Sequence, residues 1–192
     1  MEIKRATNLA DDIRERLSEL YVEAFYNDGL KYFSKDKTKL KKAFTHVFVL
    51  EYFYVVVIDN EIAGMIACMG RGPFCMDFKK KEFITHLGIL KGLFTYFAFK
   101  KYTKKCLKLD EDTAMVEFVA TSTKYLRMGI ASMLMKHIFT FPEYKHFVLE
   151  VADTNLNALE LYKKLGYKEL YRKKFVPNSG INYWIQMKYS KE

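Results

Sequence analysis

The segment from residue 113 to residue 132 could bind an anion through its main chain. The stretch TAMVEFVATS predicts a strand, and a short connection leads from it to a helix that begins near ASMLMKHIF. The first turn of a helix has N–H groups without partners and a partial positive charge, which together attract phosphate groups. Gly129 has no Cβ and would let a phosphate approach the backbone, and Ala131 is almost as small. We therefore predict an anion site on the main chain of Arg127, Met128, Gly129, Ile130, Ala131 and Ser132.

A second pattern follows about twenty residues later. The stretch VLEV at 148–151 predicts a buried strand, and residues 155–167 predict a helix that is closed by a glycine. Five residues are spaced along this helix in an ordered way, namely Asn155, Ala158, Tyr162, Gly166 and Tyr167.

Together the two patterns resemble those of the GCN5-related N-acetyltransferase (GNAT) superfamily. Its signature is R/Q-x-x-G-x-G/A after one strand and N-x-x-A-x-x-x-Y-x-x-x-G-F/Y after the next. The second pattern is complete here, whereas in the first Leu126 stands where Arg or Gln is usual and Arg127 replaces a frequent glycine. The alternative is an ordinary α/β protein with a glycine turn before one helix and a glycine cap after another. Two ordered motifs at this separation disfavour that alternative.

The resemblance implies a fold and a cofactor. It implies a single α/β (α+β) domain over residues 1–192, with a mixed, mostly antiparallel central sheet of about seven strands flanked by helices. The fourth and fifth strands would splay apart within a cofactor-binding core at 113–167. Acetyl-CoA would place its diphosphate on residues 127–132. Its pantetheine would bond to the main chain of Val119, Ala120 and Thr121, and Asn155 and Tyr162 would also contact the cofactor.

Acetyl transfer needs an acid for the departing thiolate, and the resemblance gives this role to Tyr162. A phenol with an ordinary pKa of about 10 stays protonated at neutral pH and can donate to a thiolate whose conjugate acid has a pKa of about 8.5. The alternative is a tyrosine that only packs on the cofactor or the core.

The base is assigned to Glu117 or Glu150, since both lie on the strands that would flank the thioester. Strand alternation predicts that Glu117 shares a side with Val119 and Thr121, and that Glu150 lies opposite Leu149 and Val151. Glu150, within L-E-V, also resembles in position the base of the ribosomal-protein alanine acetyltransferases. Each glutamate could instead be a structural carboxylate.

The acceptor is expected to be a primary amine on a small molecule or a peptide. The loop after the first helix lines the acceptor side in the family, and here it contains Phe25, Tyr26, Asp28 and Tyr32. The alternative function is a catalytically silent coenzyme A-binding or regulatory module, for which Leu126 is the best support.

The elements that must position these residues can be read from hydrophobic periodicity. Residues 1–6 predict a strand, residues 9–24 a helix, and a second helix begins near Asp36. A β-hairpin is predicted over 54–69 and a last strand over 181–189. The segment at about 79–105 is an extra helical insertion with one apolar stripe, and we expect it to pack on the core and to cover the acceptor pocket. The stripe consists of Phe83, Leu87, Leu90, Phe94 and Phe97.

Composition sets further limits on the function. With 192 residues and 50% hydrophobic content the chain suits one core. Cys68, Cys75 and Cys106 are scattered, no secretory signal is present and no apolar run could span a bilayer, so we expect a cytoplasmic protein without a membrane partner. The net charge of +9 comes from dispersed lysines, so no nucleic acid is expected. No metal site is predicted, and a homodimer is possible.

Overall fold

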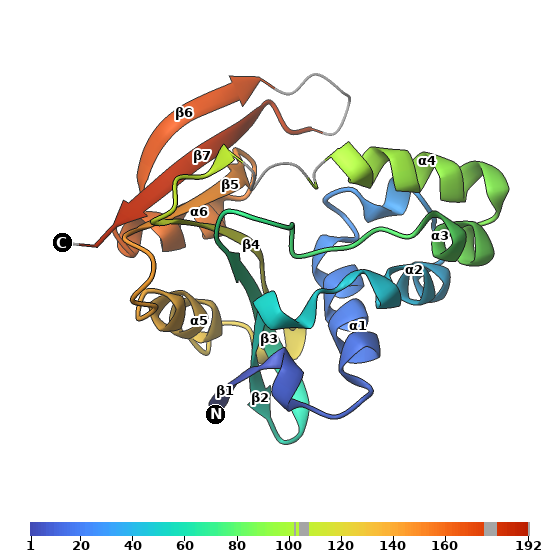
Figure 1. Ribbon diagram of the computed structural model, residues 1–192, viewed down its shortest axis with the longest axis horizontal. Coiled ribbons are helices and arrows are strands. Elements are labelled where there is room, and N and C mark those ends of the chain that lie inside the picture. Colours follow the sequence, from blue (N-terminus) through green and yellow to red (C-terminus); the bar gives the residue numbers. More distant parts are fainter. Residues whose placement is uncertain (102, 104–107, 175–179, 192) are drawn as a thin grey trace.

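Seven strands form one sheet in the order β1-β2-β3-β4-β5-β7-β6 (Figure 1). The computed structural model describes the whole chain except residues 102, 104–107, 175–179 and 192. The strands are β1 (Glu2–Arg5), β2 (Phe53–Ile58), β3 (Glu61–Met69), β4 (Thr113–Thr121), β5 (His146–Ala152), β6 (Lys168–Lys174) and β7 (Tyr183–Ser190). The helices are α1 (Ile13–Phe25), α2 (Lys37–Phe44), α3 (Lys80–Leu87), α4 (Ile89–Lys100), α5 (Ile130–Ile138) and α6 (Leu156–Lys164).

The pairing of the strands confirms the predicted fold. Among the described strands only β4 and β5 run parallel, and every other neighbouring pair is antiparallel. The parallel pair is short, because it ends at the partners Met115 and Val148. Beyond that point β4 continues along β3 and β5 continues along β7, so the two strands separate toward their carboxyl ends.

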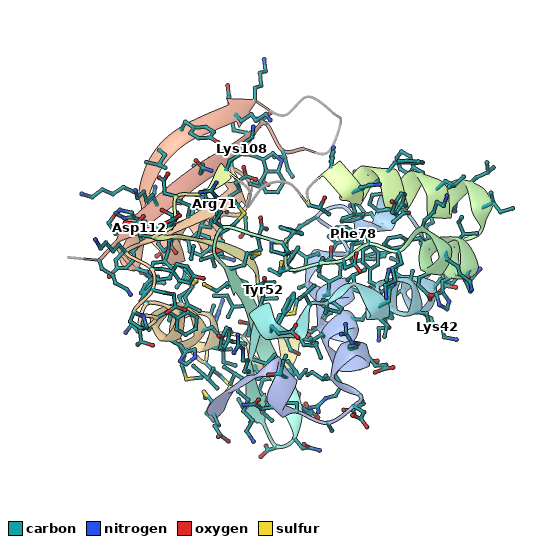
Figure 2. The ribbon with its side chains drawn as sticks, in the orientation of Figure 1. Lys42, Tyr52, Arg71, Phe78, Lys108 and Asp112 are labelled. Carbon is teal, nitrogen blue, oxygen red and sulfur yellow. The ribbon has the colours of Figure 1, made fainter. Side chains whose placement is uncertain are left out.

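The sheet has a separate apolar core on each face. Helices α1 to α4 lie on one side of the sheet in Figure 1, and α5 and α6 lie on the other. The first core joins α1, α2 and α3 to one face of β2 to β4, and the second joins α5 and α6 to the opposite face. Figure 2 shows Phe78 among the side chains of the first core, where its ring lies 5.4 Å from that of Phe99 on α4.

A glycine lets α5 approach the sheet closely. A Cβ built on Gly64 of β3 would lie 2.5 Å from Cγ2 of Ile130, the first residue of α5, and 2.9 Å from the carbonyl oxygen of Ala120. Real Cβ atoms do not approach other atoms so closely, so this position has no room for a side chain. Gly64 therefore fixes the start of α5 against β3 and β4.

The insertion after β3 differs from the single apolar stripe that the spacing predicted. Its helix is broken at Gly88, whose φ of +82° ends α3 and begins α4. Phe83, before the break, is fully buried, whereas Leu90, Phe94 and Phe97, after it, point to solvent. The prediction of one stripe packed on the core is therefore wrong for α4. A glycine with positive φ changes the direction of the chain, so the helical spacing is not maintained across it.

Two further findings concern the cysteines and the hydrophobic helices. Cys68 and Cys75 are buried, and Cys106 lies outside the described residues. In the described part of the chain, no helix has the length and apolar character needed to cross a membrane.

Candidate active site

The predicted anion site is an open helix start. Gly129 is the residue before α5 and has a left-handed backbone, with φ +76° and ψ +9°. The first N–H of this helix that reaches a backbone acceptor is that of Met133, which donates to the carbonyl of Gly129 at 2.9 Å. The N–H groups of residues 130–132 precede that bond, and no acidic side chain lies in the first turn. This helix start can therefore bind an anion.

The space in front of Gly129 is free. A Cβ built there would meet no other atom within 4 Å. Packing within the protein therefore does not require a glycine here. The two features that favour glycine are its positive φ and the open approach to the backbone. Both features fit a phosphate group that approaches the main chain, so the residues present fit the diphosphate of coenzyme A.

The two departures from the family pattern leave the main chain of this turn intact. Leu126 is 57% exposed, so its side chain does not hold the turn together. Arg127 has a φ of +64°, a conformation in which glycine is favoured. This explains why glycine is frequent at that position of the pattern.

The turn that precedes the anion site is held by two glutamates from distant elements. Oε1 of Glu23 on α1 accepts hydrogen bonds from the Thr123 backbone N–H at 2.8 Å and from the Thr123 hydroxyl at 2.5 Å. Glu61 on β3 accepts from Lys124 Nζ at 2.7 Å and from the Tyr125 hydroxyl at 2.8 Å. Hydrogen bonds from Lys124 and Tyr125 lower the pKa of Glu61, so this carboxylate remains ionised.

Sequence reasoning missed these supporting residues. Glu23 and Thr123 are separated by 100 positions, so no local spacing connects them. The available signal for a structured turn was the run of hydrogen-bonding side chains at 122–125. In the structure, a 3-10 turn in this stretch connects β4 to α5.

A bulge lies in β4 just beyond the point where β4 and β5 separate. Glu117 pairs with Ala67 of β3, and Ala120 pairs with Met65, so two residues of β4 stand opposite Ile66 alone. One of these two is Phe118, whose φ of +54° is unusual for a bulky residue. A bulge disturbs the hydrogen-bond ladder and leaves main-chain groups available for a ligand.

The bulge corrects the predicted side of Glu117. Alternation predicted that Glu117 shares a face with Val119 and Thr121, and this is wrong because the bulge inserts one residue between them. Ala67 and Met65 are two residues apart in β3 and lie on one face, so their partners Glu117 and Ala120 share that face. Val119 instead packs toward the second core.

The predicted side of Glu150 is confirmed, whereas its role as a base stays a prediction. Leu149 and Val151 belong to the second core, whereas Val148 belongs to the first, so Glu150 is on the face of Val148. Both candidate bases therefore lie on the face of the sheet that carries α1, one on each side of the separation between β4 and β5.

Tyr162 lies on the opposite face. It is 7% exposed within the second core, and its ring lies 5.7 Å from that of Tyr167. Burial and, second, the negative charge of Glu117 raise the pKa of Tyr162 well above its ordinary value. Its hydroxyl therefore keeps its proton throughout the neutral range, and the electrostatic influence of Glu117 reaches it across the sheet.

Asn155 begins α6. Its Oδ1 accepts a hydrogen bond from the N–H of Ala158 at 3.2 Å, which is the bond of a helix cap. The structure thus gives Asn155 a role in positioning α6, and with it Tyr162. Its predicted contact with the cofactor stays a prediction.

The four predicted acceptor residues are distributed over different surroundings. The ring of Phe25 lies 6.0 Å from that of Phe118, which places Phe25 beside the bulge. Tyr26 is tied within its own loop, because its hydroxyl donates to the carbonyl of Lys35 at 3.1 Å. Asp28 is exposed, and Tyr32 is 60% exposed and lines a hollow on the outer surface. Of the four, Phe25 is therefore the residue with a contact to the bulge.

Metal binding has no structural counterpart in the part of the chain that the structure describes. No group of three His, Cys, Asp or Glu side chains comes together there in a way that could hold an ion.

Comparison with known proteins agrees with this geometry. The chain is similar in structure to an N-acetyltransferase from Staphylococcus aureus Mu50, with a TM-score of 0.62, 18% identity, and coverage of 98% of this chain and 100% of the other. It is also similar to the ribosomal-protein-S18-alanine N-acetyltransferase from Escherichia coli, with a TM-score of 0.57, 13% identity, and coverage of 98% and 92%. A ribosomal-protein-alanine N-acetyltransferase from Brucella melitensis gives a TM-score of 0.60 at 10% identity and covers 100% of both chains.

These identities show the fold, and the family follows from the sequence itself. No curated protein sequence matches the chain. The family model of the acetyltransferase (GNAT) family, however, matches residues 14–167, which include the predicted anion site, both candidate bases and Tyr162. The chain belongs to the GNAT acetyltransferase family.

Proposed function

We propose that this protein transfers an acetyl group from acetyl-CoA to a primary amine by direct attack of the amine on the thioester. The observation that carries the proposal is the open start of α5 at Gly129, which follows the carboxyl end of β4, the end toward which β4 and β5 separate. A diphosphate on residues 127–132 would leave the pantetheine arm free to extend along Val119, Ala120 and Thr121. Acetyl-CoA supplies the activated acetyl group, and the chain supplies the groups that hold it and move protons.

The bulge in β4 can polarise the thioester carbonyl. Phe118 and Val119 stand opposite one residue of β3, so their main chain departs from the regular ladder. An N–H group that is fixed in this way can stabilise the negative charge that develops on the carbonyl oxygen, at little cost in reorganisation.

Proton transfers would occur on opposite faces of the sheet. Glu117 or Glu150 would take the proton from the attacking amine on the α1 face, and Tyr162 would donate to the departing sulfur from the α6 face. The two transfers are coupled if Glu117 is the base. The negative charge of Glu117 raises the pKa of Tyr162. When Glu117 takes a proton and becomes neutral, Tyr162 becomes a stronger acid as the sulfur departs.

The two variants Glu117→Gln and Glu150→Gln are made singly. We expect the one that removes the true base to flatten the acidic limb of the pH profile of kcat/KM. A carboxylate accepts a proton only when it is ionised, so in the wild type kcat/KM falls as the pH falls through its pKa. Glutamine has nearly the same size and cannot titrate. The measurement is the pH profile of each variant with one amine at fixed ionic strength.

The other glutamate is the internal control. If it is a structural carboxylate, its Gln variant lowers the free energy of unfolding and keeps the acidic limb. An unchanged limb in both variants would refute the assignment and point to water or to a residue outside β4 and β5.

The function itself is tested by thiol release from acetyl-CoA in the presence of a library of amines. The library should contain small amines and peptides that begin with alanine, because two structural neighbours are named as alanine N-acetyltransferases of ribosomal proteins. Turnover with any amine supports the proposal. Tight binding of coenzyme A without turnover on any member would instead support a catalytically silent module, for which Leu126 in place of Arg or Gln is the argument.

A further inference from the structure

Helix α4 carries four large apolar side chains that the protein leaves uncovered. Ile89, Leu90, Phe94 and Phe97 are exposed by 68%, 85%, 62% and 63%, and we call them the apolar ridge. A fully buried aromatic side chain covers about 150–250 Å², so the ridge presents on the order of 500 Å² of apolar surface. Patches of this size on a monomer often mark an interaction site.

A basic hollow of about 380 Å³ lies next to the ridge. Its one acidic side chain, Asp36, is used as the cap of α2, because its Oδ1 accepts from the N–H groups of Thr38 and Lys39. The lysines of the hollow form no ion pair with any described residue, although Lys31 faces the charge of Asp28. The hollow is lined by Lys31, Tyr32, Ser34, Lys35, Asp36, Lys39 and Lys91.

The ridge and the hollow form one surface. Lys91 of α4 lines the hollow and directly follows Leu90 of the ridge. The ring of Phe94 lies 5.6 Å from that of Phe33, which follows Tyr32 of the hollow. In Figure 1, α4 forms an outer margin of the molecule, so this surface is free to meet a large partner.

The chemistry of the surface selects among its possible partners. A second copy of this chain would bring the same four lysines together, and the chain already has a net charge of +9. A folded acidic protein would need an apolar groove shaped to the ridge and negative charges beside it. A bilayer with anionic headgroups presents both features and needs no matching shape, because its chains adapt to inserted side chains.

We propose that the apolar ridge and the basic hollow dock this protein on the surface of an anionic membrane. Ile89, Leu90, Phe94 and Phe97 would enter the boundary between headgroups and acyl chains, and the lysines would lie over the anionic headgroups. The expectation of no membrane partner rested on the absence of a run long enough to span a bilayer. Docking of a short helix on the surface needs no such run.

The test is cosedimentation of the full chain with vesicles of phosphatidylcholine alone and of equal parts phosphatidylcholine and phosphatidylglycerol. We expect binding to the anionic vesicles, weaker binding at higher salt, and little binding to phosphatidylcholine. Leu90→Gln with Phe94→Gln should weaken binding at least about tenfold, since two large apolar side chains are lost. Lys35→Gln with Lys39→Gln should weaken it by about tenfold or more.

Matched controls separate this surface from general effects of charge and hydrophobicity. Leu156→Gln removes an apolar side chain that is 72% exposed on α6, and Lys136→Gln with Lys145→Gln removes the same charge elsewhere. Both controls should bind anionic vesicles within about twofold of the wild type, and circular dichroism should show every variant folded. The proposal is overturned if the wild-type protein does not bind anionic vesicles. It is also overturned if the control variants lose as much binding as the ridge and hollow variants. A stable dimer of the wild-type protein that dissociates in the Leu90→Gln, Phe94→Gln variant would overturn it as well.

Discussion

Replacing Gly129 by valine should abolish binding of coenzyme A while the protein still folds. The free space in front of Gly129 would be filled by a branched side chain at the point where a phosphate must reach the backbone. We expect the dissociation constant to rise by at least roughly 100-fold, which corresponds to about 2.7 kcal/mol. The φ of +76° also strains any β-branched residue, so the free energy of unfolding should fall by about 1–3 kcal/mol. Calorimetry with coenzyme A and urea unfolding measure the two effects.

Gly88→Val is the matched control for this strain. Gly88 has a φ of +82° and also has no atom within 4 Å of a built Cβ, but it lies between α3 and α4 rather than at the start of α5. Its ψ of +167° lies in a region that essentially only glycine adopts, so valine there should cost at least as much stability and leave the affinity for coenzyme A unchanged. An unchanged affinity in folded Gly129→Val would show that the diphosphate binds elsewhere.

The open helix start at Gly129 and the strands around it could be predicted from the sequence, because the information is local. An apolar strand, a glycine and an amphipathic helix follow one another within about twenty residues, and each has its own propensity. The same holds for the start of α2, which was predicted near Asp36 and lies at Lys37, with the Asp36 side chain as its cap. The order of these elements then limits the possible topologies to a few.

The bulge in β4 could not be predicted in this way. Positive φ is usually signalled by glycine or asparagine, but here it falls on Phe118, inside an apolar run. Phe118 can adopt this conformation because tertiary packing surrounds it, with the rings of Tyr21 and Phe25 at 5.5 Å and 6.0 Å. Those contacts join residues that are far apart in the chain, so they cannot be predicted from the local pattern of a strand.

The outer elements show the limits of periodicity. Strand β6 is exposed at every position and therefore shows no alternation of buried and exposed residues. For this reason the hydropathy pattern predicted no strand there. Helix α4 has the opposite problem. Its apolar spacing is helical, but a pattern cannot tell a face that packs on the core from one that is left exposed for a partner.

Replacing Tyr162 by phenylalanine should lower turnover by roughly 10²- to 10⁴-fold and leave the affinity for coenzyme A nearly unchanged. The ring keeps its packing in the second core, and the group that is lost is the protonated hydroxyl. The pKa of this hydroxyl lies well above the ordinary value, so the loss should be constant across the neutral pH range. The measurements are single-turnover rates of thiol release, and calorimetry with coenzyme A.

Tyr167→Phe is the control for Tyr162→Phe. Tyr167 is also buried, and its hydroxyl has no hydrogen-bond partner among the described residues, so its removal should leave turnover unchanged. The influence of Glu117 on Tyr162 adds a sharper test. If the two residues act as a coupled base and acid, the double variant of Glu117→Gln and Tyr162→Phe should lose much less activity than the product of the two single losses. A wild-type chemical step in the Tyr162→Phe variant would mean that Tyr162 only packs against the core, and that the thiolate takes its proton from solvent.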